Sequence, residues 1–376
     1  MDDSSGRNPV SARANGRMKI LVVQDHLRSG GTERQACLLA NAFAAGGHEA
    51  TLLTFRPGGA LAHAPAPQVQ RICLQPFDLG WDWFAPGLTR RSRAIAPDVV
   101  LCLGRMANGW AGWIARRLPS ARVVATVRTG KPLPWAYRRS LQTVSHVVAN
   151  STETGQRLVE TGVVARERLS VIPNALVFPP LAHPDPGART AVRERHGAGA
   201  DTLVFLWVGM FRPEKNHRAL IEHLAQLPAT PPWQLWLAGD GPTRPEIERL
   251  ARALGIIDRI RFLGFVADPT SLYLAADAAL MTSRRESLSN FLIEAHAHGL
   301  PSLAYAATGV PECGGVTVPM DDGARFSGEL RRLVDDPAWR QQEGKRLAAF
   351  AREEFSTERR TNAYLSLFQR LISPSA

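Results

Sequence analysis

The first patterned segment of the chain is a continuous apolar run at residues 20–23, which is typical of a strand buried on both faces. A glycine turn follows at 29–31. Apolar residues then recur at helical spacing until Gly46-Gly47, where two glycines permit the positive φ that often ends a helix. The next apolar run, at 50–55, predicts a second strand. This order of strand, helix and strand predicts a βαβ unit.

The same alternation continues through both halves of the chain. Strands are predicted in the first half at 99–103, 122–127, 146–149 and 169–172, and in the second half at 203–208, 234–238, 259–263, 278–281 and 301–304. Helices are predicted at 219–227, 246–254, 291–298 and 356–372. Alternating strands and helices in both halves predict an α/β fold with two doubly wound parallel sheets.

The domain organisation follows from length and from a change in composition. A chain of 376 residues is long enough for two cores, and proline and glycine concentrate between residues 178 and 200. We therefore expect a disordered tail at 1–17, an N-terminal domain at 18–178, a linker at 179–200, a C-terminal domain at 201–355 and a C-terminal helix at 356–376 that packs back on the N-terminal domain.

Apolar runs and cysteines predict the compartment. No run approaches the roughly 18 apolar residues of a spanning helix, and residues 1–17 lack the apolar stretch of a signal peptide. The four cysteines show no paired spacing, which fits a reducing compartment. These features predict a cytoplasmic protein.

The net charge of +11 indicates that the protein binds anionic partners. Arginine supplies most of the cations, including the pairs at 90–91, 116–117 and 138–139. No zinc-finger or RNA-binding signature accompanies them, so we expect no nucleic-acid partner. We favour an anionic membrane surface or an anionic acceptor, which would place the protein peripherally at the inner face of the cell membrane. A basic surface that is merely solvated is the alternative.

The segment from 282 to 301 carries the strongest chemical signal. Glu286 and Glu294 flank a turn-like stretch, 287–290, that leads into an apolar helix, and serine and asparagine at this place are N-cap residues. A helix start offers unpaired backbone N–H groups and partial positive charge, which suit a diphosphate. Each carboxylate can accept hydrogen bonds from a pair of hydroxyl groups, as sugars and ribose offer. Spacing alone leaves open a capped amphipathic helix with two solvated glutamates.

This segment resembles the Glu-x7-Glu signature of the retaining family-four glycosyltransferases, whose GT-B fold has two facing Rossmann-like domains and an interdomain cleft. The resemblance includes Asn290, the apolar helix and the closing Gly-Leu-Pro. Further segments match in the family's order: GGTER at 30–34, VIPN at 171–174, GMFRPEKN at 209–216, AGDGP at 238–242 and FLGF at 262–265. The resemblance therefore covers about residues 18–370.

The resemblance assigns the charged residues to parts of the donor. Lys215 would neutralise charge on the leaving diphosphate, and Glu286 would bind hydroxyl groups of the transferred sugar. Glu294 would hold the ribose. The family usually has an arginine directly after the glycine of the diphosphate loop, where this chain has Met210. Arg212 lies two residues further, on the same face of an extended strand end, and would reach the same phosphates.

The other residues implied by the resemblance would bind the donor through backbone or apolar contacts: Gly30, Gly31, Phe265, Leu288, Ser289 and Asn290. A second departure follows the strand at 122–127. Many relatives place a histidine there, whereas this chain has Arg128, which cannot accept a hydrogen bond. Arg128, Lys131 and His26 are therefore the candidates for contact with the acceptor or the sugar, and a purely structural role is the alternative for His26.

Signatures of several other chemistries are missing from the sequence. No Asp-x-Asp triplet or His/Cys cluster offers a metal site, no Gly-x-Ser-x-Gly elbow occurs, and the glycines do not form Gly-x-Gly-x-x-Gly. We therefore expect no metal or other cofactor. The family resemblance implies an enzyme that moves a sugar, with retained configuration, from a nucleotide diphosphate sugar to a glycan or lipid-linked acceptor such as a lipopolysaccharide precursor. A nucleotide-sugar epimerase of the same fold and a catalytically silent sugar-nucleotide-binding protein are the alternatives.

Overall fold

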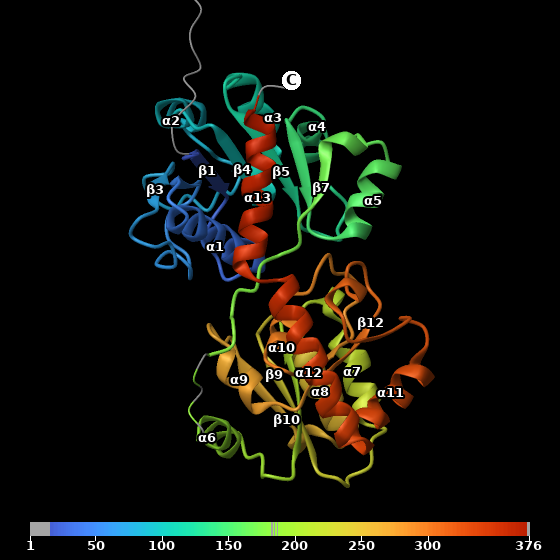
Figure 1. The fold of residues 1–376 in the computed structure, drawn as a ribbon. Helices are drawn as coiled ribbons and strands as arrows, with labels where there is room; N and C mark the ends of the chain where they lie inside the picture. Colours follow the sequence, from blue (N-terminus) through green and yellow to red (C-terminus); the bar gives the residue numbers. More distant parts are fainter. Residues whose placement is uncertain (1–15, 182, 184, 186, 374–376) are drawn as a thin grey trace, which may run out of the picture.

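The computed structural model describes residues 16–181, 183, 185 and 187–373, which form two lobes stacked one above the other (Figure 1). The N-terminal domain is the upper lobe and the C-terminal domain the lower one. Residues 1–15 of the expected disordered tail lie outside the described residues, and Gly16 and Arg17 are exposed and without regular structure.

The N-terminal domain is built on a seven-stranded parallel sheet. From edge to edge its strands are β3 (Gln70–Cys73), β2 (Glu49–Thr54), β1 (Lys19–Gln24), β4 (Val99–Cys102), β5 (Arg122–Val127), β6 (His146–Ala149) and β7 (Leu169–Val171). The strand order reverses between β1 and β4. In such sheets ligands bind beside the carboxyl ends of the strands at this reversal.

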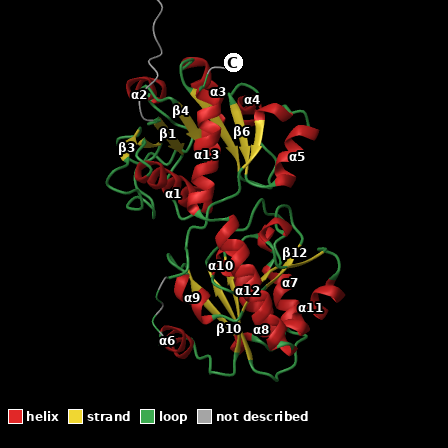
Figure 2. Cartoon of the chain, viewed as in Figure 1, coloured by secondary structure: helices red, strands yellow, loops and turns green. Residues whose placement is uncertain are grey.

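Two helical layers cover this sheet (Figure 2). The face of Leu21 and Val23 packs against α2 (Leu88–Ile95), α3 (Arg105–Arg117), α4 (Trp135–Leu141) and α5 (Thr152–Glu160). The opposite face packs against α1 (Gly31–Ala45) and the C-terminal helix α13 (Thr357–Ile372). Tyr364, Leu367 and Phe368 of α13 are buried in this second layer, so the last helix of the chain completes the core of the first domain.

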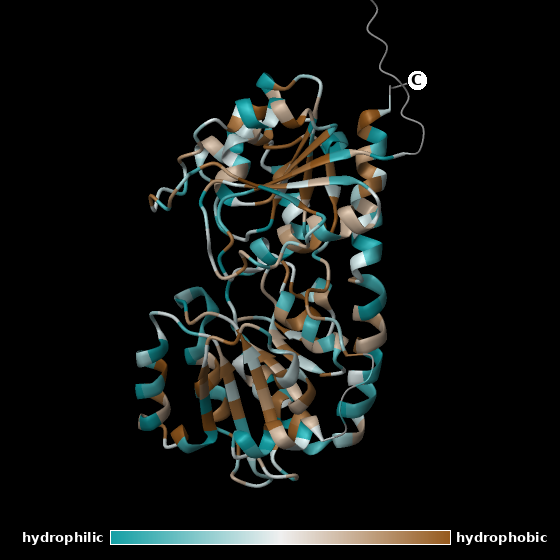
Figure 3. Cartoon of the chain, turned by 90° about the vertical axis from the view of Figure 1, so that its left-hand side faces the viewer, coloured by the Kyte–Doolittle hydropathy of each residue, from teal (hydrophilic) through white to brown (hydrophobic). Residues whose placement is uncertain are grey.

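The C-terminal domain has a six-stranded parallel sheet. Its strands, in spatial order, are β10 (Ile260–Gly264), β9 (Trp233–Ala238), β8 (Leu203–Val208), β11 (Ala278–Met281), β12 (Ser302–Tyr305) and β13 (Val316–Val318). The helices of this domain are α7 (His217–Leu224), α8 (Arg244–Ala253), α9 (Thr270–Ala275), α10 (Asn290–Ala297), α11 (Gly323–Asp335) and α12 (Pro337–Glu354). Apolar strands lie inside and polar helix faces outside (Figure 3). The strand order reverses between β8 and β11, which brings the loops after these two strands together.

The segment expected as a linker at 179–200 contains a helix. Residues 188–195 form α6 (Ala188–Arg195), which packs on α9 of the C-terminal domain. Arg193 of α6 is buried and its Nη1 lies 3.1 Å from Oδ2 of Asp277. The sequence pattern did not predict this helix because a buried arginine, rather than an apolar stripe, anchors it.

A reciprocal pair of carboxylates joins the two domains. Glu312, in the 3-10 turn Pro311–Cys313, accepts a hydrogen bond from the backbone N–H of Thr152 at 2.8 Å, at the start of α5. Glu153 of α5 accepts in turn from the hydroxyl group of Thr308 at 2.9 Å. Each carboxylate therefore satisfies donors of the opposite domain, and Glu312 also meets the positive end of α5.

Candidate active site

Helix α10 begins after β11, where the sequence predicts an anion site. Ser289 is its N-cap, and the Oγ of Ser289 accepts a hydrogen bond from the backbone N–H of Leu292 at 3.3 Å. Leu288 and Ser289 are buried, whereas Asn290 is partly exposed. The positive end of the helix dipole therefore lies at an accessible turn.

Two loops of the N-terminal domain contact this turn. A Cβ on Gly31 would lie 2.7 Å from Nδ2 of Asn290, and a Cβ on Gly130 would overlap the carbonyl oxygen of Glu286. Asn174 donates a hydrogen bond from Nδ2 to Oδ1 of Asn290 at 2.7 Å. Glycine at positions 31 and 130 therefore lets the two domains meet at the predicted donor segment.

The residues assigned to the diphosphate and to the sugar form an ion pair. Lys215 ends the 3-10 turn Pro213–Lys215, and its Nζ lies 2.6 Å from Oε1 of Glu286. Both side chains are largely buried. The adjacent Glu214 lies 2.8 Å from Nζ of Lys131 in the N-terminal domain, and this hydrogen bond lowers the pKa of the Glu214 carboxyl group. Lys131 thus forms an ion pair across the domain interface.

Glu294 lies on α10 with its carboxyl group buried. Its Oε2 accepts a hydrogen bond from the hydroxyl group of Tyr273 at 3.2 Å. Burial raises the pKa of Glu294 to about 8, although the Tyr273 hydrogen bond and the positive charge of Arg34 act in the opposite direction. A buried carboxyl group with so perturbed a pKa is typical of functional sites, and further hydroxyl donors would stabilise its charged form.

Arg212 and Phe265 are both exposed. Burial raises the pKa of Glu33, which follows the Gly30-Gly31 turn, and the positive charge of Arg212 counteracts this shift. The charge of Arg212 therefore acts on a carboxyl group beside the glycine turn of the other domain. Phe265, directly after β10, is 57% exposed and presents an open aromatic ring.

Arg128 and His26, two acceptor-side candidates, are engaged in contacts within the protein. The guanidinium group of Arg128 donates to Oδ1 of Asn174 and, at 2.7 Å, to the hydroxyl group of Tyr364. Because Asn174 also binds Asn290, Arg128 supports the donor segment indirectly. His26 is buried, its Nε2 lies 3.0 Å from the carbonyl oxygen of Pro57, and burial lowers its pKa. Among the hydrogen bonds of the described residues, none joins His26 to the donor segment.

Three residues at this site were not predicted as site residues. Asn174 lies in the 171–174 segment that carries the family resemblance, so its position was recognisable. Gly130 follows the strand at 122–127, but only the contact with Glu286 reveals its role. Tyr273 lies on α9, its ring stacks on His298 with centroids 5.0 Å apart, and no local sequence pattern shows such tertiary packing.

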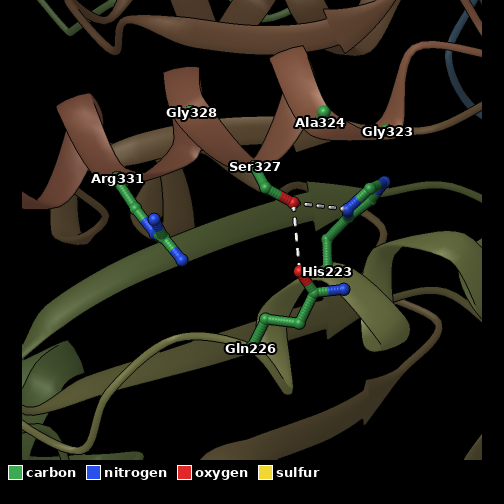
Figure 4. Close-up of a pocket in the computed structure, with 7 residues that line it drawn as sticks. All are labelled: His223, Gln226, Gly323, Ala324, Ser327, Gly328 and Arg331. Atoms are coloured by element: carbon green, nitrogen blue, oxygen red, sulfur yellow. Dashed lines mark hydrogen bonds between the residues drawn. The ribbon is translucent and has the colours of Figure 1, made fainter.

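A separate pocket of about 440 Å³ lies in the C-terminal domain between α7 and α11 (Figure 4). There the Oγ of Ser327 lies 3.1 Å from Nδ1 of His223 and 3.3 Å from Oε1 of Gln226. None of the predicted site residues lines this pocket. Throughout the described part of the chain, no group of three or more His, Cys, Asp or Glu residues is placed to hold a metal ion.

Comparison with known proteins covers both domains. Residues 29–176 match the model of glycosyltransferase family 4, and residues 202–336 match that of group 1 glycosyl transferases. The chain is 30% identical over 363 residues to the lipopolysaccharide core biosynthesis glycosyltransferase LpsD of Rhizobium meliloti (strain 1021), an alignment that covers 92% of this chain and 96% of LpsD. LpsE of the same organism is 27% identical over 351 residues, with 90% of this chain and 96% of LpsE covered.

Solved structures share the fold. Alr3699/HepE of Anabaena, in complex with UDP and glucose, superposes with a TM-score of 0.79 at 22% identity, covering 94% of this chain and all of that chain. WaaG, a glycosyltransferase involved in lipopolysaccharide biosynthesis, superposes with a TM-score of 0.72 at 17% identity, covering 93% of this chain and 99% of that chain. The expected pair of Rossmann-like domains is thereby confirmed. Given a relative that matches over nearly its whole length and family models that match in both domains, this chain belongs to the family-four glycosyltransferases of the GT-B fold.

Proposed function

We propose that this glycosyltransferase moves a hexose from a nucleotide diphosphate sugar to a hydroxyl group of a lipopolysaccharide or other lipid-linked glycan precursor, with retained anomeric configuration and without a metal ion. The observation that carries the proposal is the cluster around the start of α10. Lys215 pairs with Glu286, Glu294 lies buried on the helix, and Gly31 and Gly130 of the other domain approach Asn290 and Glu286. The three side chains suit the diphosphate, the sugar and the ribose of such a donor.

The proposed reaction breaks the bond between the anomeric carbon and the diphosphate oxygen. The acceptor oxygen forms its bond to the same carbon from the same face, and the acceptor proton passes to the leaving phosphate. Lys215, Arg212 and the positive end of α10 stabilise the charge that grows on the diphosphate, so they act most strongly in the transition state. These groups supply the positive charge for which other enzymes use a metal ion.

The similar proteins support a choice of substrates to test first. HepE of Anabaena holds UDP and glucose, and LpsD and LpsE act in lipopolysaccharide core biosynthesis. We therefore propose a UDP-hexose as the donor and a lipopolysaccharide core saccharide as the acceptor, and these are the first two substrates to test together.

Purified protein incubated with UDP-hexoses, with and without that acceptor, tests the proposal. We expect free nucleotide only when the acceptor is present, and a product whose anomeric configuration, read by NMR, equals that of the donor. A donor sugar that changes configuration without an acceptor would indicate the epimerase. Donor binding without turnover on any acceptor would indicate the silent binding protein, and an inverted product would contradict retention.

A further inference from the structure

Exposed aromatic side chains gather in one part of the N-terminal domain. Six of them, each between 42% and 76% exposed, form what we call the aromatic surface: Phe77, Trp81, Trp83, Phe84, Trp113 and Trp135. Large exposed apolar patches are uncommon on soluble proteins and mark sites of interaction. The aromatic surface therefore indicates a partner that the donor site does not explain.

Contacts among these residues show that the loop before α2 lies over α3. The ring of Trp83 packs on α3, since a Cβ on Gly109 would lie 2.7 Å from it. The indole N–H of Trp110 donates to the carbonyl oxygen of Trp83 at 3.1 Å. Helix α4, which begins with Trp135, packs beside α3, which carries Trp113. The loop, α3 and α4 are therefore neighbours on one side of the domain.

The loop is held in shape by buried and charged groups. Gln75 is buried, and its Nε2 donates to the carbonyl oxygens of Trp81 and Phe84 at 2.9 and 2.7 Å. Arg56, just after β2, forms ion pairs with both aspartates of the loop, at 2.8 and 2.6 Å. Rings on a preordered loop bind a partner without a further loss of loop entropy.

The segment that carries the aromatic surface is also rich in arginine. Residues 77–139 contain ten arginines and one lysine against three aspartates, a formal charge of +8 within the +11 of the whole chain. Arg128 and Lys131 belong to the contacts described above, and the other nine cations of this segment are arginines. The guanidinium carbon of Arg117 lies 4.3 Å from the ring centroid of Trp113, and that of Arg139 lies 5.9 Å from the ring centroid of Trp135. Apolar rings and positive charge therefore occur side by side.

We propose that the aromatic surface docks on an anionic lipid bilayer. Tryptophan rings favour the level of the lipid headgroups, and basic side chains near an anionic leaflet each add affinity. A neutral glycan would account for exposed rings but not for the concentrated charge. In the described part of the chain no helix is long and apolar enough to cross a bilayer, so this docking is peripheral.

The position of the loop connects docking to catalysis. Arg56 holds the loop at the carboxyl end of β2, and Gly31 and Gly130 lie at the carboxyl ends of β1 and β5 in the same parallel sheet. Carboxyl ends of parallel strands share one edge, so the docked loop borders the predicted donor site. With this placement, a lipid-borne hydroxyl group would reach the donor while its lipid stays in the bilayer. This step of the argument rests on the proposed function.

Vesicle co-sedimentation without donor or acceptor tests docking independently of sugar transfer. The vesicles are phosphatidylcholine alone or mixed with phosphatidylglycerol. One double variant removes rings (Phe77→Ser, Trp81→Ser) and a second removes charge (Arg116→Ser, Arg117→Ser). Matched controls on the C-terminal domain are Leu254→Ser, which is 42% exposed in the parent, and Arg249→Ser with Arg252→Ser on α8.

The parent and both controls should bind the mixed vesicles and not those of phosphatidylcholine alone, and added salt should release them. The arginine variant should bind about tenfold more weakly at low salt, with a smaller loss at high salt. The ring variant should bind about tenfold more weakly at every salt concentration. Unchanged thermal melting curves establish that the variants fold.

The proposal is overturned if the parent binds neither vesicle or both equally, or if the two variants bind as the parent does. It is also overturned if the ring variant keeps full vesicle binding but loses transfer to a delipidated core saccharide, because the rings would then bind glycan. If only the proposed function is wrong, the parent and the variants should bind vesicles as expected, but no nucleotide sugar should give turnover.

Discussion

Lys215 binds Glu286, with 2.6 Å between Nζ and Oε1, although the family resemblance assigns the two residues to different parts of the donor. The pair orients the lysine side chain in a largely buried position. In the proposed complex with the donor, the lysine would instead contact phosphate oxygens and the glutamate sugar hydroxyl groups. This exchange makes Lys215 a residue whose effect should appear mainly in turnover.

Lys215→Ala should lower the turnover number by roughly 10²–10³-fold, because the charge that it stabilises develops on the leaving diphosphate. Donor affinity, measured by calorimetry with UDP, should change less than turnover. Lys345→Ala on α12 is the control, since it removes an exposed lysine of the same domain. A turnover number equal to that of the parent at saturating substrates would remove Lys215 from the mechanism.

Glu294 should make stability depend on pH. Burial raises its pKa from 4.5 to about 8, so the folded protein keeps a proton that the unfolded chain releases above about pH 4.5. The free energy of unfolding therefore falls as pH rises between these values, by up to about 1.4 kcal/mol per pH unit for this group. Glu294→Gln removes this contribution, and urea unfolding at pH 5.5 and 7 measures it. Parallel pH profiles for parent and variant would contradict the prediction.

Nucleotide binding should release a proton from Glu294. Ribose hydroxyl groups donate to the carboxylate form, so the bound ligand lowers a pKa that is about 8 in the free protein. Calorimetric titration with UDP at pH 7 in two buffers of different ionisation enthalpy should show up to about one proton released. Glu294→Gln should show weaker binding, by roughly 1.5–3 kcal/mol, and no release from this group. If Glu294→Gln releases as many protons as the parent on binding UDP, the proton comes from another group.

Gly130→Ala should disturb the domain interface, because its methyl group would overlap the carbonyl oxygen of Glu286. We expect turnover to fall at least about tenfold while the melting temperature changes little, since the two lobes can separate slightly without unfolding. Gly328→Ala on α11 is a matched control, because an added Cβ there meets no atom within 4 Å. Turnover of Gly130→Ala at the level of this control would show that the close approach is dispensable.

Activity should survive removal of divalent ions. Lys215, Arg212 and the start of α10 would already supply positive charge to the diphosphate. Rates measured before and after treatment with EDTA should agree. Loss of activity that magnesium or manganese restores would show that the transfer needs a metal ion.

The central strands could be predicted from the sequence because each is a continuous apolar run buried on both faces, as in β1 and β8. The edge strands β3 and β13 were not predicted. Gln70–Cys73 is largely exposed and Val316–Val318 has only three residues, so neither carries a strong apolar pattern. The helices α11 and α12 were not predicted either, although both carry buried apolar residues.

The candidate site also contains residues that the sequence identified and contacts that it did not. Glu286 and Glu294 were recognisable because they lie in one short segment with a known signature. Arg128 and Lys131 were singled out as candidates for contact with the acceptor or the sugar, but their partners were not predicted. Asn174, the partner of Arg128, lies 46 residues away in the same domain, and Glu214, the partner of Lys131, lies in the other domain. Spacing along the chain carries no information about such contacts, and the acceptor-side roles of these residues stay predictions.

Helix α13 has a consequence for the order of events during synthesis. Its Tyr364 and Phe368 fill the same layer as Ile20 and Phe43, so the first domain to leave the ribosome lacks part of its interior until residues 357–372 follow. Until then the surface of α1 that α13 covers stays open to water and to other chains. A nascent N-terminal domain would therefore be the species most exposed to chaperones and proteases, and a fragment ending near residue 178 would be a poor stand-in for the mature domain.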